Sequence, residues 1–249
     1  MFRAAKTETG EILFTGDKLT GGMFVIGHRG ARAVEPENTL RAIRAGMKCA
    51  GYVEVDVRLS RDRVPVILHD AGLERTTNGA GHVGDFGLSD LRKLDAGKGE
   101  RIPTLEEVCR EVRGRCGLVV ELKEPGSEEE VSAVLRNSGL EDIWVVSFHP
   151  ACIRAMDVLS PGVRSGFIFS QTTPGPVLTA RELGCQAILP KFVLVTTGLV
   201  RTSHASGLKV ITWTLNSPSD FMKAREFGVD GFATDDPCRA KDYLMKNPR

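Results

Sequence analysis

The sequence has no excess of charge of either sign and no long apolar run. Its 33 Lys and Arg residues nearly balance its 32 Asp and Glu residues, so no overall field draws it to nucleic acid or to an anionic membrane. No stretch approaches the roughly 20 apolar residues that a membrane helix needs, and residues 1–16 contain no apolar run of signal-peptide length. We therefore expect a soluble, cytoplasmic protein with no nucleic-acid partner and no membrane insertion.

Paired cysteines and a glycine-rich phosphate loop are also missing. The six cysteines are scattered singly, without a C-x-x-C pair or the density of a disulfide scaffold: Cys49, Cys109, Cys116, Cys152, Cys185 and Cys238. We expect them to be reduced and mostly to fill the core. No G-x-G-x-x-G follows the first expected strand, which argues against a dinucleotide-binding fold.

Short apolar runs that alternate with helical periods are present throughout the chain. The expected strands are residues 23–27, 52–58, 118–123, 143–148, 164–169, 186–189, 209–215 and 230–234. Thr104 with Glu107, and Ser127 with Glu130, have capping-box spacing, and Ser217 precedes a proline suited to a first helical position. Eight strands separated by helices predict an α/β protein with a TIM (β/α)8 barrel over residues 23–249, and an open doubly wound sheet is the main rival.

Two segments break the βα repeat. Residues 1–22 form an N-terminal extension, in which residues 2–5 and 11–14 could pair as a hairpin that turns at 7–10. Residues 71–103 are rich in Gly, Asp and Thr and too long for an ordinary barrel loop, so they predict a small insertion after the second-strand hairpin. An insertion at the C-terminal ends of barrel strands can cover the active site.

The stretch "VEVDVRLSRDRVPVILHD", residues 53–70, places Glu54 and Asp56 on one face of a strand, because side chains alternate along it. This face could be the wet side of a surface hairpin or a cation site. Other polar residues also stand at the ends of expected strands, and a barrel would bring them to one rim, which favours the cation site. These residues are His28, Arg29, Glu121, Lys123, Trp213 and Asn216.

The hairpin that follows the two carboxylates brings a histidine back to them. A turn at Arg61-Asp62 pairs residue 56 with 67 and residue 54 with 69, whereas a turn at Asp62-Arg63 pairs 56 with 69. Either register returns His69 to the level of the carboxylates.

The residue types at this rim predict a metal, an anion and proton transfer. Glu54, Asp56 and Glu121 offer oxygen ligands that suit one Mg²⁺ or Ca²⁺ ion better than zinc. Arg29 and Lys123 add positive charge, so the ligand should be anionic, and phosphate suits an arginine in particular. An ion pair of Glu121 with Lys123 inside the barrel is the structural alternative.

Two histidines beside these groups suggest acid–base chemistry near neutral pH. His28 and His69 therefore form a candidate acid–base pair, in which one histidine takes a proton from the attacking hydroxyl and the other protonates the departing alcohol.

In order along the chain, the motifs from residue 24 to the C-terminus resemble those of the glycerophosphodiester phosphodiesterases. They include "GHRG" at 27–30, "PENTL" at 36–40, "EVDV" at 54–57, "VPVILHD" at 64–70, "ELK" at 121–123, "WTLN" at 213–216 and "GVDGFATDDP" at 228–237. The resemblance implies metal-dependent hydrolysis of small-molecule glycerophosphodiesters to sn-glycerol 3-phosphate and an alcohol.

Carried onto matching positions, the resemblance also implies roles for individual residues. It makes His28 and His69 the acid–base pair, Glu54, Asp56 and Glu121 the metal ligands, Arg29 and Lys123 the phosphate ligands, Phe148 and Trp213 apolar walls near the glycerol, and Asn216 a polar contact.

The sequence departs from the family pattern at two places. His149 follows the "SF" motif at 147–148, where the family usually has an acidic residue, and Asp62-Arg63 stands where Asp-Gly is usual. Alternative functions are a lysophospholipase D or phospholipase C-like lipase and a non-catalytic phosphate-binding barrel. A homodimer is possible. The head group, the physiological metal and the choice between a cyclic phosphate and direct attack by water stay open.

Overall fold

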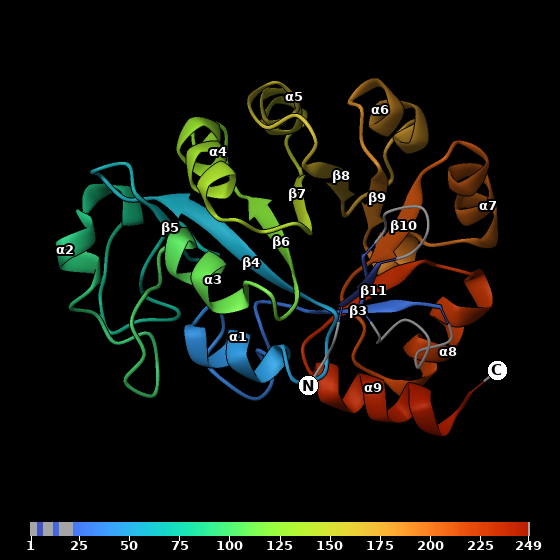
Figure 1. Ribbon diagram of the computed structural model, residues 1–249, viewed down its shortest axis with the longest axis horizontal. Helices are drawn as coiled ribbons and strands as arrows, with labels where there is room; N and C mark the ends of the chain where they lie inside the picture. Colours follow the sequence, from blue (N-terminus) through green and yellow to red (C-terminus); the bar gives the residue numbers. More distant parts are fainter. Residues whose placement is uncertain (1–3, 7–11, 15–21, 249) are drawn as a thin grey trace.

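Eight parallel strands form a closed barrel in the part of the chain that the structure describes. This structure is a computed structural model, and it describes residues 4–6, 12–14 and 22–248. The strands are β3 (Phe24–Gly27), β4 (Tyr52–Leu59), β6 (Gly117–Leu122), β7 (Ile143–Ser147), β8 (Arg164–Phe169), β9 (Ala187–Pro190), β10 (Lys209–Thr212) and β11 (Gly231–Thr234). They pair in sequence order around the barrel, and pairing of β3 with both β11 and β4 closes it (Figure 1). The predicted TIM barrel is confirmed, and the open sheet is wrong.

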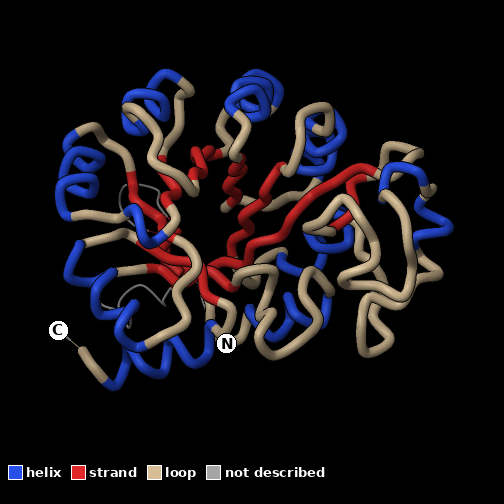
Figure 2. Tube along the Cα trace, turned by 180° about the vertical axis from the view of Figure 1, so that it is seen from behind, coloured by secondary structure: helices blue, strands red, loops and turns tan. Residues whose placement is uncertain are grey.

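Helices lie outside the strands and connect them, as Figure 2 shows. They are α1 (Leu40–Gly46), α3 (Leu105–Val112), α4 (Glu128–Asn137), α5 (Pro150–Leu159), α6 (Pro176–Glu182), α7 (Thr197–Ala205), α8 (Pro218–Phe227) and α9 (Pro237–Lys246). The capping box of Thr104 and Glu107 is present at α3, and Ser217 caps α8 by accepting from the Asp220 N–H. Ser127 makes no side-chain cap bond at α4; its hydroxyl donates to the Glu124 carbonyl, and Glu130 pairs with Arg63.

Strand β4 shows how the barrel sorts its side chains. Val53, Val55 and Val57 face outward and are fully buried under the helices. Glu54 and Asp56 face the barrel interior and are also buried, so the strand is not a half-wet surface hairpin. Apolar side chains fill the rest of the interior, among them Ile26, Tyr52, Val119, Trp144, Val146, Ile168, Leu189 and Ile211.

The segment after β4 forms a small unit beside the barrel. Strand β5 (Pro65–Ile67) pairs antiparallel with β4, followed by a 3₁₀ turn (Val83–Asp85) and α2 (Leu88–Leu91), on the left of Figure 1. Leu73, Val83, Leu91 and Ile102 form its core with two residues of the β5 segment, Val66 and Leu68. At the N-terminus, β1 (Ala4–Lys6) pairs antiparallel with β2 (Ile12–Phe14), and the turn expected at 7–10 lies outside the described residues.

Both predicted registers of the β4–β5 hairpin are wrong. Val57 pairs with Ile67 and Leu59 with Pro65, so the loop contains three residues centred on Asp62. Ser60 closes the loop by accepting the Arg63 N–H on its carbonyl, and its own N–H donates to the Val64 carbonyl. Arg63 takes the left-handed conformation there (φ 59°). A three-residue loop with its last residue in this conformation is a common hairpin connection, which the two-residue prediction left out.

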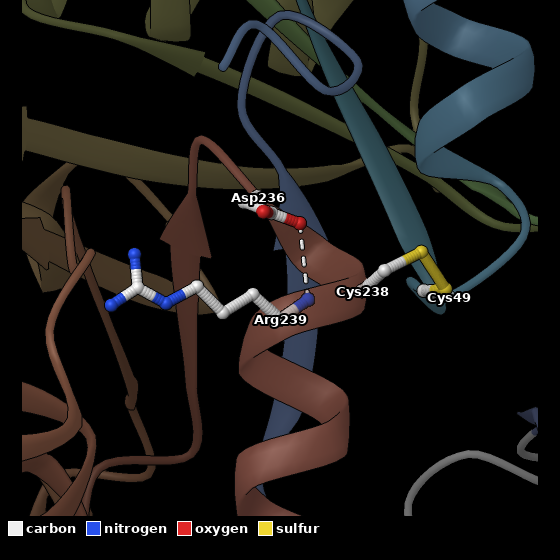
Figure 3. Close-up of a disulfide and its surroundings, with 4 residues drawn as sticks. All are labelled: Cys49, Asp236, Cys238 and Arg239. Atoms are coloured by element: carbon white, nitrogen blue, oxygen red, sulfur yellow. Dashed lines mark hydrogen bonds between the residues drawn. A yellow bond between two sulfur atoms is a disulfide. The ribbon is translucent and has the colours of Figure 1, made fainter. Parts of the chain in front are cut away.

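The expectation that all six cysteines are reduced is also wrong. Cys49, just after α1, and Cys238, in the first turn of α9, form a disulfide between positions 189 residues apart (Figure 3). Asp236 caps the same turn of α9 through the Arg239 N–H. The other four cysteines are buried free thiols, as expected: Cys109, Cys116, Cys152 and Cys185.

Within the described residues, no helix is both long enough and apolar enough to cross a membrane.

Breaking the disulfide should lower the stability of the fold. A cross-link across so long a loop contributes about 3–5 kcal/mol by restricting the unfolded chain. We expect Cys238→Ser, or a reducing agent, to lower the thermal midpoint by about 10 °C in a calorimetric scan. Cys185→Ser is the control for removal of a buried thiol and should remain sensitive to the reducing agent. An identical midpoint for the oxidised and reduced wild-type protein would contradict this prediction.

Candidate active site

Three carboxylates meet inside the barrel, from the middle of β4 and from the C-terminal end of β6. Glu54 and Asp56 come from β4, and Glu121 lies opposite Asp56 on the neighbouring β6. One carboxylate oxygen of each residue lies within 4.8 Å of those of the other two. The strand register therefore builds the cluster that the sequence predicted.

Burial and mutual repulsion give the carboxylates unequal pKa values. Burial, with the charges of Asp56 and Glu121, raises the pKa of Glu54 well above its usual range. Burial and Asp56 raise the pKa of Glu121 to about 7. Burial would also raise the pKa of Asp56, but the ammonium of Lys123 and the guanidinium of Arg29 lower it instead. Asp56 therefore stays ionised, whereas Glu54 and Glu121 hold protons more readily and would lose them when a cation binds.

A hard divalent cation fits this cluster. Glu54 Oε2 accepts the Arg29 backbone N–H at 2.8 Å, whereas the buried Glu54 Oε1 has no hydrogen-bond partner among the described residues. An unpaired buried carboxylate oxygen is costly, and a metal ion would satisfy it. Three carboxylates without a sulfur ligand suit Mg²⁺ or Ca²⁺.

Arg29 and Lys123 line the same cavity and neutralise part of the cluster. Arg29 Nε lies 3.2 Å and Lys123 Nζ 3.3 Å from the two oxygens of Asp56. Lys123 also binds Glu121 at 2.5 Å, so the ion pair considered as an alternative exists within the site. Both cations remain close enough to the cavity to contact an anion bound beside the metal.

The "GHRG" turn needs its glycines to hold Arg29 in place. Arg29 has the left-handed conformation (φ 51°), and Gly30 follows with φ 85°. A Cβ on Gly30 would lie 2.4 Å from the carbonyl carbon of Ala42, and one on Gly27 would lie 2.2 Å from the Gly30 oxygen. Only glycine allows this close approach between the turn and α1.

His28 is held by an acidic residue that directly follows the last strand. Its Nδ1 lies 2.7 Å from Asp235 Oδ1, and its Nε2 lies 4.0 Å from Glu54 at the carboxylate cluster. Asp235 is fixed in turn by Asn216 and Arg32, each at 2.8 Å. Burial lowers the pKa of His28 despite the Asp235 charge, so the free ring is largely neutral near pH 7.

His69 is held by a longer chain of contacts that returns to Arg29. Its Nδ1 lies 2.5 Å from Asp70, Asp70 pairs with Arg75, and Arg75 donates to Glu37 at 2.8 Å. Glu37 then accepts from Arg29 at 2.7 Å. Burial also lowers the pKa of His69. The insertion thus contributes Arg75 as a bridge between the two sides of the site.

One cavity of about 150 Å³ contains the histidines, cations and carboxylates on one side and apolar side chains on the other. Phe148 and Trp213 lie edge to face there, with ring centroids 5.7 Å apart. Asn216 does not line this cavity, because its amide engages Asp235 and Thr234. Of the other nine predicted site residues, eight line the cavity. The ninth, Asp56, pairs with Arg29 and Lys123, which line it.

Sequence reasoning missed the residues that orient the site: Glu37, Asp70, Arg75 and Asp235. Asp235 directly follows a strand, and Asp70 follows His69, so position along the chain gave a usable signal for both. Glu37 lies in the "PENTL" motif but received no role from it, and nothing local indicated Arg75, because their contact joins the turn before α1 to the insertion. His149, the departure from the family pattern, is exposed at the N-cap of α5.

The comparisons with known proteins agree with this geometry. Residues 28–239 match the model of the glycerophosphoryl diester phosphodiesterase family. The chain belongs to this family. A glycerophosphodiester phosphodiesterase of Caldanaerobacter subterraneus is 33% identical over 228 residues, covering 86% of this chain and 94% of the relative.

Solved structures of the family have the same fold. A phosphodiesterase of Oleispira antarctica, in complex with the product sn-glycerol-3-phosphate, is 31% identical with a TM-score of 0.84 and covers 89% of this chain and 96% of its own. A glycerophosphodiester phosphodiesterase of Agrobacterium tumefaciens is 28% identical, with a TM-score of 0.81. The match covers 88% of this chain and 99% of the Agrobacterium chain.

Loss of one cluster carboxylate should weaken cation binding without unfolding the barrel. Glu54→Gln keeps the shape of the protonated side chain but removes a ligand charge, so we expect the Kd for Mg²⁺ or Ca²⁺ to rise about tenfold or more in titration calorimetry. Glu124→Gln is the matched control, because Glu124 pairs with Arg58 outside the cluster. Equal affinity of the Glu54→Gln variant and the wild type would count against the site.

Proposed function

We propose that this chain hydrolyses glycerophosphodiesters to sn-glycerol 3-phosphate and an alcohol, with a divalent cation and with His28 and His69 as the acid–base pair. The main support for this proposal is that both histidines line one cavity with two of the carboxylates and with the side chains of Arg29 and Lys123. Membership of the family supports the reaction class, and the product in the Oleispira antarctica structure supports the product.

The phosphate of the substrate would bind between Arg29 and Lys123. Their positive groups counter the diester charge and the additional charge that develops on phosphorus-bound oxygens. Glu54, Asp56 and Glu121 would hold Mg²⁺ or Ca²⁺, which supplies Lewis-acid polarisation of the phosphate when bound. Apolar contact with Phe148 and Trp213 would position the carbon skeleton of the glycerol.

The histidines would move the two protons that the reaction requires. One imidazole takes a proton from the attacking hydroxyl as its oxygen bonds to phosphorus, and the other gives a proton to the alcohol oxygen as its bond to phosphorus breaks. Asp235 and Asp70 each bind Nδ1, which leaves Nε2 of both rings for this role.

The attacking hydroxyl belongs either to water or to the neighbouring glycerol carbon. In the second case a cyclic phosphate forms first, and water opens it with the same two proton transfers reversed in role.

The alternatives to a soluble diesterase have less support. A lipase that acts on membrane lipid needs a continuous exposed apolar surface near the site. Phe86 and Leu88 of the insertion are half-buried against its own core, and the exposed Val34 and Val193 follow different strands, β3 and β9. A non-catalytic phosphate-binding barrel would lack part of the catalytic set, whereas every proposed ligand and both histidines are present here.

The cytoplasmic location stays a prediction, and the Cys49–Cys238 disulfide bears against it, because disulfides persist mainly in oxidising compartments. The homodimer likewise stays a prediction.

The reaction should depend on the added cation. We expect release of sn-glycerol 3-phosphate from glycerophosphocholine or glycerophosphoethanolamine with Mg²⁺ or Ca²⁺, and loss of release when a chelator is added. A coupled assay of the product over a panel of glycerophosphodiesters tests this, with metal added back as the control. No turnover of any member with either metal would overturn the proposed function.

Each histidine should be required for turnover. We expect His28→Ala and His69→Ala each to lower kcat by about 10²-fold or more, since each removes one proton transfer. His204→Ala is the control, because His204 pairs with Asp230 away from the cavity and should keep its kcat. Near-normal turnover in either active-site variant, with circular dichroism unchanged, would refute that residue's assignment.

A further inference from the structure

The rim of the barrel opposite the carboxylate cluster carries no acidic side chain close to the strands. Four stretches form it, at the ends of β7, β8, β9 and β10: residues 147–154, 170–176, 191–197 and 213–219. Their charged residues are Arg154 and Lys191, and their one histidine is His149. The nearest carboxylate along the chain, Asp220 in the first turn of α8, accepts from the Ser217 hydroxyl at 2.7 Å. This half of the rim is therefore neutral or positive, whereas the other half concentrates the metal-binding carboxylates.

Lys191 directly follows β9 and continues the alternation of its inward-facing side chains. Leu189 lines the cavity, and Lys191 follows it by two residues in extended backbone (φ −56°, ψ 139°), so both side chains share the inward face. Lys191 stands one layer nearer the mouth than Leu189.

Backbone bonds hold Lys191 on both sides. Its N–H donates to the Phe169 carbonyl at 2.8 Å, and the next N–H, of Phe192, donates to the Trp213 carbonyl at 2.9 Å. Lys191 thus pairs directly with Trp213, a residue of the cavity wall.

Among the described residues, the ammonium of Lys191 has no partner. The side chain is exposed, and it forms no hydrogen bond or ion pair with any residue that the structure describes. Lys123, by contrast, is engaged by two carboxylates on the opposite side of the cavity. An unpaired cation at the mouth of a binding site favours ligands with negative charge at that position.

We propose that this site selects glycerophosphodiesters whose alcohol portion carries a further negative charge, with Lys191 as the residue that recognises it. This inference rests on the proposed function, in which the diester phosphate binds deep in the cavity between Arg29 and Lys123. The part of the substrate that extends past the aromatic wall to the mouth then meets Lys191.

A cationic head group has one argument in its favour and a stronger one against it. The Phe148–Trp213 pair could bind a quaternary ammonium through its ring faces. However, Lys191 pairs with Trp213 at the same wall, and no acidic residue of the four stretches offsets its charge. The neighbouring lysine therefore repels the choline group that the rings would attract.

Three substrates that differ in the charge of the departing alcohol test the inference. In bis(glycerophospho)glycerol the alcohol is anionic, in glycerophosphoglycerol it is neutral, and in glycerophosphocholine it is cationic. In the wild type we expect kcat/KM to decrease in this order. We expect the ratio of kcat/KM for bis(glycerophospho)glycerol to that for glycerophosphocholine to be about tenfold lower in Lys191→Met and lower still in Lys191→Glu. Added salt should lower the wild-type ratio but not that of Lys191→Met.

Lys209→Met is the matched control, because Lys209 is exposed at the opposite end of the barrel, at the start of β10. It should leave the ratio unchanged. A ratio that stays within twofold of the wild type in Lys191→Glu overturns the inference and leaves the proposed function intact. Absence of turnover with all three substrates overturns the proposed function and this inference with it.

Discussion

The structure depends on the repulsion among three buried carboxylates and on the groups that counter it. Glu54, Asp56 and Glu121 are held together by the register of β4 against β6, which fixes them regardless of their mutual repulsion. Arg29 and Lys123 offset part of the negative charge, and an unpaired oxygen of Glu54 is left over. This incomplete compensation is the reason for proposing a cation site next to an anion site, because the same pair of positive groups faces both the cluster and the cavity.

The elements that orient the histidines come from distant parts of the chain. Asp235 reaches His28 across 207 residues, from the last strand to the first. Arg75 of the insertion joins Asp70, which holds His69, to Glu37, which holds Arg29. The insertion therefore connects the histidine on one side of the cavity with Arg29, the proposed phosphate ligand, on the other. Barrel closure, which places β11 beside β3, is what makes the first of these contacts available.

Much of the fold and the centre of the site could be predicted from the sequence, because both depend on local periodicity. Alternation along residues 52–58 placed Glu54 and Asp56 on one face, and the repeated strand and helix signals gave the barrel its eight strands. The barrel brought the strand ends together, but individual pairings between distant side chains could not be predicted, since spacing along the chain carries no signal for them. The Cys49–Cys238 disulfide and the turn of Asn216 toward Asp235 are of this kind. The hairpin register failed for a local reason, as Arg63 adopts a conformation that its residue type does not suggest.

The most direct test of the cation site is anomalous diffraction from crystals grown with Mn²⁺ and sn-glycerol 3-phosphate. The ion should give a peak bonded to Glu54, Asp56 and Glu121, with a phosphate oxygen of the ligand on the same ion and the other oxygens near Arg29 and Lys123. A manganese peak elsewhere in the chain, with the ligand bound away from these carboxylates, would contradict the assignment of the site.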